Sequence, residues 1–70
     1  MFVIQSYPKS ELALIYFPKS TPHVAANHLR NWIHGCPELH EALQHINLSP
    51  RAKYYSAEAV RLIVQYLGEP

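Results

Sequence analysis

The sequence predicts one mainly α domain in which four helices accompany a minimal pairing of two short β-strands. Three observations lead to this fold class. Seventy residues suffice for a single domain over residues 1–70, with a thin core. Apolar residues recur at helical spacing in four segments, and each segment opens with a proline or a hydroxyl residue that suits a helix start. Two further short stretches have the apolar or aromatic content of strands.

The N-terminal quarter is expected to hold a strand followed by a helix. The loose alternation of Phe2–Ser6 is typical of a short strand. Pro8 suits the first turn of a helix, and Glu11 lies favourably near the positive end of the helix dipole. We expect this helix to run from about Pro8 to Tyr16, because Pro18 prevents its continuation.

The next two helices have clear start signals. Thr21-Pro22 combines a capping hydroxyl with a proline at the first helical position, which predicts a helix over 22–34. Gly35 is expected to end it in a left-handed conformation. Cys36-Pro37 repeats the start pattern and predicts a third helix to about Ile46.

The C-terminal third predicts a turn, a strand and a helix. Leu48–Pro50 is a turn sequence, and the aromatic content of Ala52–Tyr55 favours a strand. Ser56 is expected to cap a helix over 57–67, which Gly68 ends. The two predicted strands are short enough to pair with each other, and each leads directly into a helix.

Helix 22–34 carries the most informative side chains. Leu29 and Trp32 are expected to anchor its apolar face, and Asn, His and Arg occupy the opposite face. Arg can bond guanine and Asn can bond adenine in the major groove, while residues before a recognition helix can hold phosphate. In the simpler interpretation this face is only solvated, as on any surface helix. The DNA-binding candidates on and before this helix are Lys19, Thr21, His23, Asn27, Arg30 and Asn31.

A second pointer to DNA follows near the C-terminus. The stretch Pro50–Ser56 and the helix after it resemble the wing of MerR-type and excisionase-type winged helix-turn-helix proteins, whose wing is rich in Arg and Tyr. The resemblance implies a small winged helix-turn-helix-like domain in which Arg51 and Lys53 contact the DNA backbone. In the alternative, Tyr54 and Tyr55 simply pack and Lys53 is solvated.

Composition limits the function further. Six Lys and Arg against five acidic residues give a formal charge of +1, which is low for a nucleic-acid binder. With two glycines, no Asp and no strained turn around a serine, we expect neither an enzyme nor a cofactor. His34, Cys36 and His40 lack the paired spacing of structural zinc sites, so no metal is expected.

The same composition bears on localisation. The lone Cys36 favours a reducing compartment, and no run of about 18 apolar residues is present. The N-terminus lacks the basic start of a signal peptide. We therefore expect a cytoplasmic protein with no membrane partner and no small-molecule substrate.

Helix 57–67 suggests a different partner. Its apolar arc covers about 200°, roughly twice what a surface helix needs to reach its core. Leu62, Val64 and Tyr66 are therefore candidates for self-association as a homodimer, unless the N-terminal segments of the same chain cover them. Two hypotheses follow: a non-enzymatic regulatory or accessory protein that binds double-stranded DNA through helix 22–34, or a protein–protein adaptor whose contact surface is helix 57–67.

Four segments resemble a family of short bacterial proteins, domain of unknown function 4248. They are Glu11–Pro18, Asn27–Ile33, Pro37–Leu39 and Val60–Pro70, and they span nearly the whole chain. The terminal Leu-Gly-Glu-Pro is the most distinctive of these motifs. The resemblance implies a whole protein rather than a fragment, and it brings no activity, ligand or catalytic residue.

Overall fold

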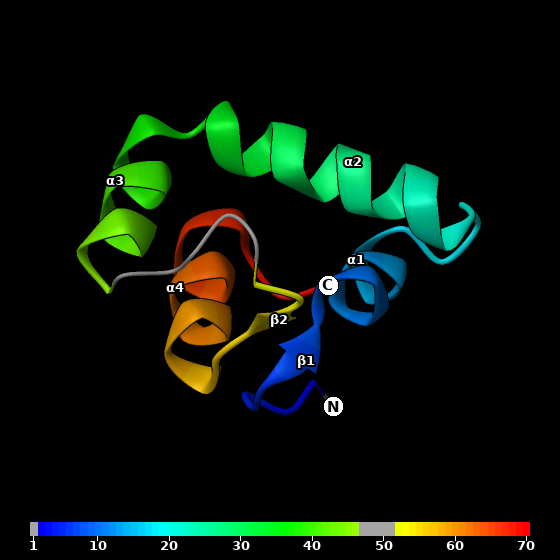
Figure 1. Cartoon of the computed structure of the whole chain (residues 1–70), viewed down its shortest axis with the longest axis horizontal. Coiled ribbons are helices and arrows are strands. Elements are labelled where there is room, and N and C mark those ends of the chain that lie inside the picture. Colours follow the sequence, from blue (N-terminus) through cyan, green and yellow to red (C-terminus); the bar gives the residue numbers. More distant parts are fainter. Residues whose placement is uncertain (1, 47–51) are drawn as a thin grey trace.

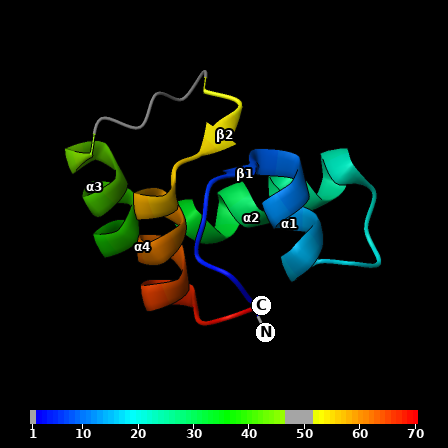
Figure 2. The same ribbon diagram turned by 90° about the horizontal axis from the view of Figure 1, so that it is seen from below.

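Helices dominate the computed structural model, which describes residues 2–46 and 52–70. The elements are β1 (Tyr7–Pro8), α1 (Lys9–Tyr16), α2 (Pro22–His34), α3 (Pro37–His45), β2 (Tyr54–Tyr55) and α4 (Ala57–Leu67). The predicted class, a mainly α domain of four helices with a minimal two-stranded pairing, is confirmed. α2 lies along one side of the molecule, with α1 near its N-terminal end, α3 and α4 near its C-terminal end, and the strands between them (Figures 1 and 2).

Local signals set the helix limits. Thr21 Oγ1 accepts a hydrogen bond from the Val24 N–H at 3.4 Å, and Ser56 Oγ accepts one from the Ala59 N–H at 3.2 Å. Each cap satisfies an amide that the first helical turn leaves without an intrahelical partner. Gly68 follows α4 with φ 88°, in the left-handed region that favours glycine. The predicted limits of α2 and α4 are thereby confirmed.

Gly35 differs from its expected left-handed conformation. Its φ of −73° and ψ of −9° are right-handed, so this prediction was wrong. The Gly35 N–H still donates to the Asn31 carbonyl at 2.9 Å, and the Cys36 N–H donates to the Ile33 carbonyl at 3.1 Å. The last turn of α2 therefore tightens and leads straight to Cys36, where the extended backbone begins the turn into α3.

The first strand lies later than predicted, at Tyr7–Pro8 instead of Phe2–Ser6. Tyr7 pairs antiparallel with Tyr55, and the next bond in line runs from the Lys9 N–H to the Lys53 carbonyl at 2.9 Å. Upstream, the Tyr7 hydroxyl donates to the Val3 carbonyl at 2.7 Å, which closes a loop over residues 3–7. The Phe2 ring stacks on the Tyr7 ring at 5.5 Å, so these local contacts take the place of a strand over residues 2–6.

The core takes one or two large side chains from each helix. Leu12 of α1, Leu29 of α2, Leu39 of α3, and Val60 and Ile63 of α4 are fully buried. Burial of each such side chain stabilises the fold by about 1.5–3 kcal/mol. The expected anchoring of α2 through Leu29 is confirmed.

Trp32 does not point into this core, contrary to prediction, and is 48% exposed. Its ring lies edge-on to Phe17 at 4.8 Å and to Tyr16 at 6.3 Å. Tyr16 is the last residue of α1 and Phe17 follows it, so both rings meet the indole at the rim of the α1–α2 contact. Trp32 therefore covers the edge of the core, at the boundary with solvent, and does not fill its centre.

The predicted turn at Leu48–Pro50, together with Arg51, lies outside the described residues. Among residues 2–46 and 52–70, no helix has the length and apolar character needed to cross a membrane.

Candidate functional site

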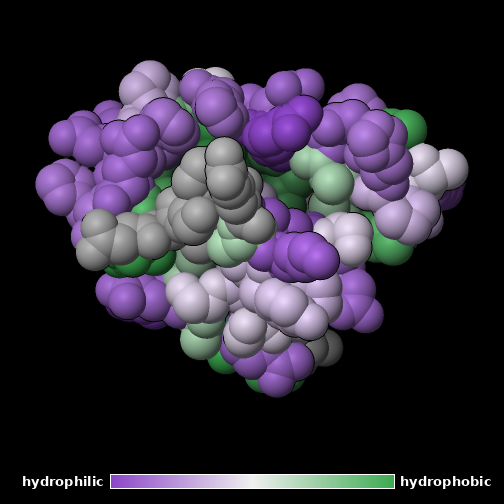
Figure 3. Space-filling model, viewed as in Figure 1, coloured by the Kyte–Doolittle hydropathy of each residue, from purple (hydrophilic) through white to green (hydrophobic). Residues whose placement is uncertain are grey.

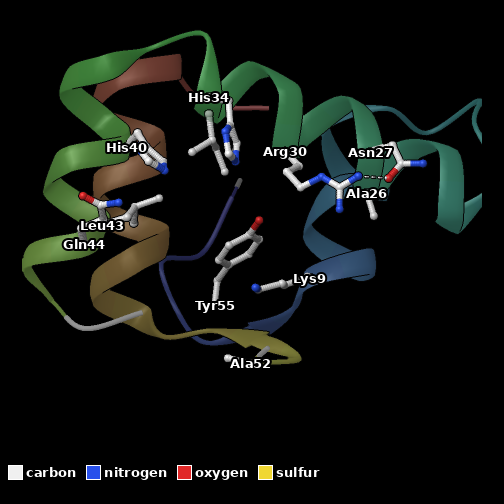
Figure 4. A pocket seen from close by; sticks show the side chains of 11 residues that line it. Lys9, Ala26, Asn27, Arg30, His34, His40, Leu43, Gln44, Ala52 and Tyr55 are labelled. Carbon is white, nitrogen blue, oxygen red and sulfur yellow. Dashed lines mark hydrogen bonds between the residues drawn. The ribbon is translucent and has the colours of Figure 1, made fainter. Parts of the chain in front are cut away.

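A polar stripe runs along one side of α2. His23, Asn27, Arg30 and His34 follow the spacing i, i+4, i+7, i+11, which places them in one row on a helix. Arg30 Nη2 donates to Asn27 Oδ1 at 2.7 Å (Figure 4). Asn27 Nδ2 lies 3.4 Å from His23 Nε2. Asn27 therefore holds the Arg30 guanidinium in a defined orientation.

The charge of Arg30 has no carboxylate partner among the described residues. α2 contains no Asp or Glu, and the His45–Glu41 pair on α3, at 3.7 Å, is the one ion pair found in residues 2–46 and 52–70. An exposed guanidinium with an oriented plane and no internal counter-charge is available to an external anion.

A pocket of about 510 Å³ opens beside this stripe, between α2, α3 and β2. Figure 3 shows the same face, hollowed below the hydrophilic residues of α2, with hydrophobic residues visible inside the hollow. The described lining residues include no acidic side chain. They are Lys9, Ala26, Asn27, Arg30, Ile33, His34, His40, Leu43, Gln44, Ala52 and Tyr55.

Lys9 and Tyr55 form the side of the pocket that faces α2 (Figure 4). Lys9 Nζ lies 5.2 Å from the centre of the Tyr55 ring, within the range of a cation–π interaction. Burial and, second, the charge of Arg30 lower the pKa of Lys9 from its usual 10.5. Burial raises the pKa of Tyr55 above 10.0, while Arg30 acts in the opposite direction. Tyr55 is therefore a neutral phenol at neutral pH, and the field of Arg30 reaches both residues.

The polar stripe continues from α2 onto α3. The rings of His34 and His40 lie 4.8 Å apart, and Gln44 follows one turn beyond His40. Each neutral imidazole has one donor and one acceptor nitrogen. Within the described ranges, no three His, Cys, Asp or Glu side chains gather in a way that would hold a metal ion.

The structure brings together only part of the predicted DNA-binding set. Asn27 and Arg30 line the pocket, and His23 adjoins them. Asn31 is exposed on the same helix, one residue beyond Arg30. Lys53 is exposed beside the backbone of Lys9.

Two further members of the set, both described, lie apart from the pocket. Lys19 and Thr21 precede α2 and are exposed at its N-terminal end, and the hydroxyl of Thr21 serves as the helix cap. Arg51 is not among the described residues.

Five polar or charged residues that line the pocket lie outside the predicted binding set: Lys9, His34, His40, Gln44 and Tyr55. Lys9 comes from the first helix and Tyr55 from the second strand, so no local pattern connects them. The expected pairing of the two strands was the one signal for Lys9. In the observed register Tyr7 pairs with Tyr55, and this places Lys9 beside Lys53.

The predicted self-association surface on α4 is partly covered by the same chain. Leu62 and Val64 are half-buried and pack against the core, whereas Tyr66 is 39% exposed. Self-association through these residues stays a prediction.

The fold and the site define a small mainly α domain with an acid-free polar stripe beside a ligand-sized pocket. The chain belongs to the family described as domain of unknown function DUF4248, whose sequence model matches residues 3–70. The predicted family is thereby confirmed. No curated protein and no solved structure matches the chain.

Proposed function

We propose that this protein binds double-stranded DNA through α2, without catalysis, in a regulatory or accessory role. The observation that carries the proposal is the exposed Arg30 guanidinium, held by Asn27 at 2.7 Å on a helix without acidic residues. A bidentate Arg is the commonest specific reader of guanine in the major groove.

The dimensions of α2 suit this role. Its 13 residues span about 20 Å, and an α-helix with its side chains is about 10–12 Å across, which fits a major groove about 12 Å wide. The Asn27–Arg30 bond reduces the conformational freedom that Arg30 would lose on binding, which favours affinity. His23 and Asn31, both exposed, are further candidates for contact with base edges.

Lysines at two places are available for the phosphate backbone. Lys19 and Thr21 lie before the N-terminus of α2, where free amides and the helix dipole favour phosphate. Lys53 precedes β2 and is exposed, so its ammonium group is free to reach a backbone phosphate. A cytoplasmic location, which the sequence predicts, agrees with a DNA-binding role.

The salt dependence of binding tests the proposal. About four cationic contacts should give a log–log slope of affinity against salt near −3.6. The measurement is fluorescence anisotropy with a mixed-sequence duplex at several salt concentrations. Absence of binding at low salt would remove the proposal.

Arg30→Gln should weaken DNA binding by about 5- to 150-fold, because it removes a base-reading contact. Arg61→Gln is the matched control, since Arg61 is also exposed but lies on α4. Equal losses in the two variants would mean that only net charge matters and that α2 is not the reading element.

A further inference from the structure

The pocket between α2, α3 and β2 has the properties of a small-molecule site. Its volume of about 510 Å³ lies within the range of roughly 300–1,000 Å³ common for such sites. Apolar surface from Ile33, Leu43 and Tyr55 combines with a few polar groups on the walls. This is the mixture that orients an organic ligand with one polar end.

The fold holds two cations at this pocket without a described acid to separate them. Lys9 belongs to α1 and Arg30 to α2, and both line the pocket. Burial of Lys9 and, second, its repulsion by Arg30 lower the pKa of Lys9. An anion bound between them would relieve the repulsion, and a doubly charged group would balance both cations.

We propose that this pocket binds a small organic phosphate, with its phosphate group between Lys9 and Arg30 and its apolar body against Tyr55, Ile33 and Leu43. Phosphate fits because its oxygens accept paired hydrogen bonds from a guanidinium and match the point charge of an ammonium. The orientation of Arg30 by Asn27 prepares it for such a contact. The site goes beyond the proposed DNA-binding function and does not depend on it.

The opposite wall supplies groups for the rest of the ligand. His34 and His40 lie across the pocket from Tyr55 (Figure 4), and Gln44 stands beside them. Imidazole and amide groups can donate or accept hydrogen bonds, so they suit the polar atoms of a heterocycle or a sugar. The neutral Tyr55 hydroxyl is a further donor or acceptor.

The test compares three probes by NMR titration of the backbone amides. Phenyl phosphate carries both the dianion and the apolar ring, inorganic phosphate carries only the anion, and phenol carries only the ring. We expect phenyl phosphate to bind most tightly and to shift amides of Lys9, Tyr55 and residues 26–34. Binding of phenyl phosphate no tighter than that of phenol would overturn the proposal.

Charge variants identify the contact. Lys9→Gln and Arg30→Gln should each weaken phenyl phosphate binding by about tenfold or more, because each removes a charged hydrogen-bond donor. Lys9→Arg should retain binding, and Arg61→Gln should leave it unchanged. Well-dispersed amide spectra establish that the variants are folded. Unchanged affinity in folded Lys9→Gln and Arg30→Gln would overturn the proposal.

The pH dependence provides an independent readout. Because the pKa of Lys9 is lowered, Lys9 loses its charge at a lower pH than an ordinary lysine does. The affinity for phenyl phosphate should therefore begin to fall at that lower pH, and Lys9→Arg should abolish the fall. Among residues 2–46 and 52–70, the other titratable groups that line the pocket are Arg30, His34, His40 and Tyr55. The pKa of Tyr55 is shifted upward and that of Lys9 downward, and only a fall caused by Lys9 disappears in Lys9→Arg, so this variant distinguishes the two groups.

A double comparison separates this site from the proposed DNA surface. Lys19→Gln should weaken duplex binding and leave phenyl phosphate binding intact, since Lys19 lies outside the pocket. One result would overturn the small-molecule proposal: the duplex displaces phenyl phosphate competitively, and Lys9→Gln weakens the binding of both ligands equally. The pocket would then be a site for a phosphate of the DNA backbone. If the protein binds phenyl phosphate but not duplex DNA, only the DNA-binding proposal fails.

Discussion

Asn27 determines how the charge of Arg30 is presented. An unrestrained surface arginine samples many rotamers, and ordering it on binding costs about 0.5–1.5 kcal/mol. The 2.7 Å bond from Arg30 to Asn27 removes part of that cost in advance. Both proposed ligands, a guanine edge and a phosphate, use the same planar donor set. The DNA-binding proposal and the phosphate-site proposal therefore both depend on the Asn27–Arg30 pair.

Tyr55 should make stability depend on alkaline pH. Burial raises its pKa above 10.0 in the folded state, so the fold favours the neutral phenol. This contribution to stability is complete below pH 10 and is lost as the pH rises through the folded-state pKa. We expect the loss of stability as the pH rises above 10 to be smaller in Tyr55→Phe than in the wild type. Urea unfolding at a series of pH values measures it.

Tyr54→Phe is the matched control for this prediction. Tyr54 is adjacent in the same strand but 58% exposed, so Tyr54→Phe removes the same hydroxyl group from an exposed position. Lys9, whose pKa is lowered, acts in the opposite direction, and it is present in both variants. A pH profile of Tyr55→Phe identical to that of Tyr54→Phe would contradict the assignment.

At the scale of single elements, caps and prolines define the helices. Ser56 accepts from the Ala59 amide at 3.2 Å at the start of α4, and α4 supplies three buried core residues. Ser56→Ala should destabilise the protein by about 1 kcal/mol and lower the melting temperature by about 4–8 °C. Thermal unfolding followed by circular dichroism measures the change. Ser56→Asp, which restores a capping oxygen, should recover most of it, and failure to do so would argue against the cap.

The strands show how much an element depends on its partner. Phe2–Ser6 has an apolar alternation that predicts a strand, yet the pairing forms at Tyr7–Pro8. A strand is stabilised by cross-strand bonds, so its position is set where a second segment arrives. Here that segment is Tyr54–Tyr55, and Tyr55 is buried in the core. The packing of Tyr55 in the core, and not the local sequence, therefore sets the position of the short strand pairing.

At the scale of the whole molecule, a thin core carries the stability. A 70-residue domain is stable by about 3.5–10 kcal/mol, and Leu29 is fully buried at its centre. Leu29→Ala should cost about 2–5 kcal/mol, a large share of that total. Chemical denaturation measures it. Val24→Ala, on the same helix but 43% exposed, should cost far less, and similar costs at both positions would contradict this account of the core.

Sequence by itself determined the four helices, the single mainly α domain and the Asn27–Arg30 stripe. These features follow from local causes: caps and prolines act within one turn, and helical spacing places residues three or four apart on one side. Tertiary structure alone decided where the strands pair, how far Trp32 is exposed and that a pocket exists. Lys9, Arg30, His40 and Tyr55 come from four different elements, and only the packing of those elements brings them to one cavity. A concave site depends on long-range contacts, and no local pattern encodes them.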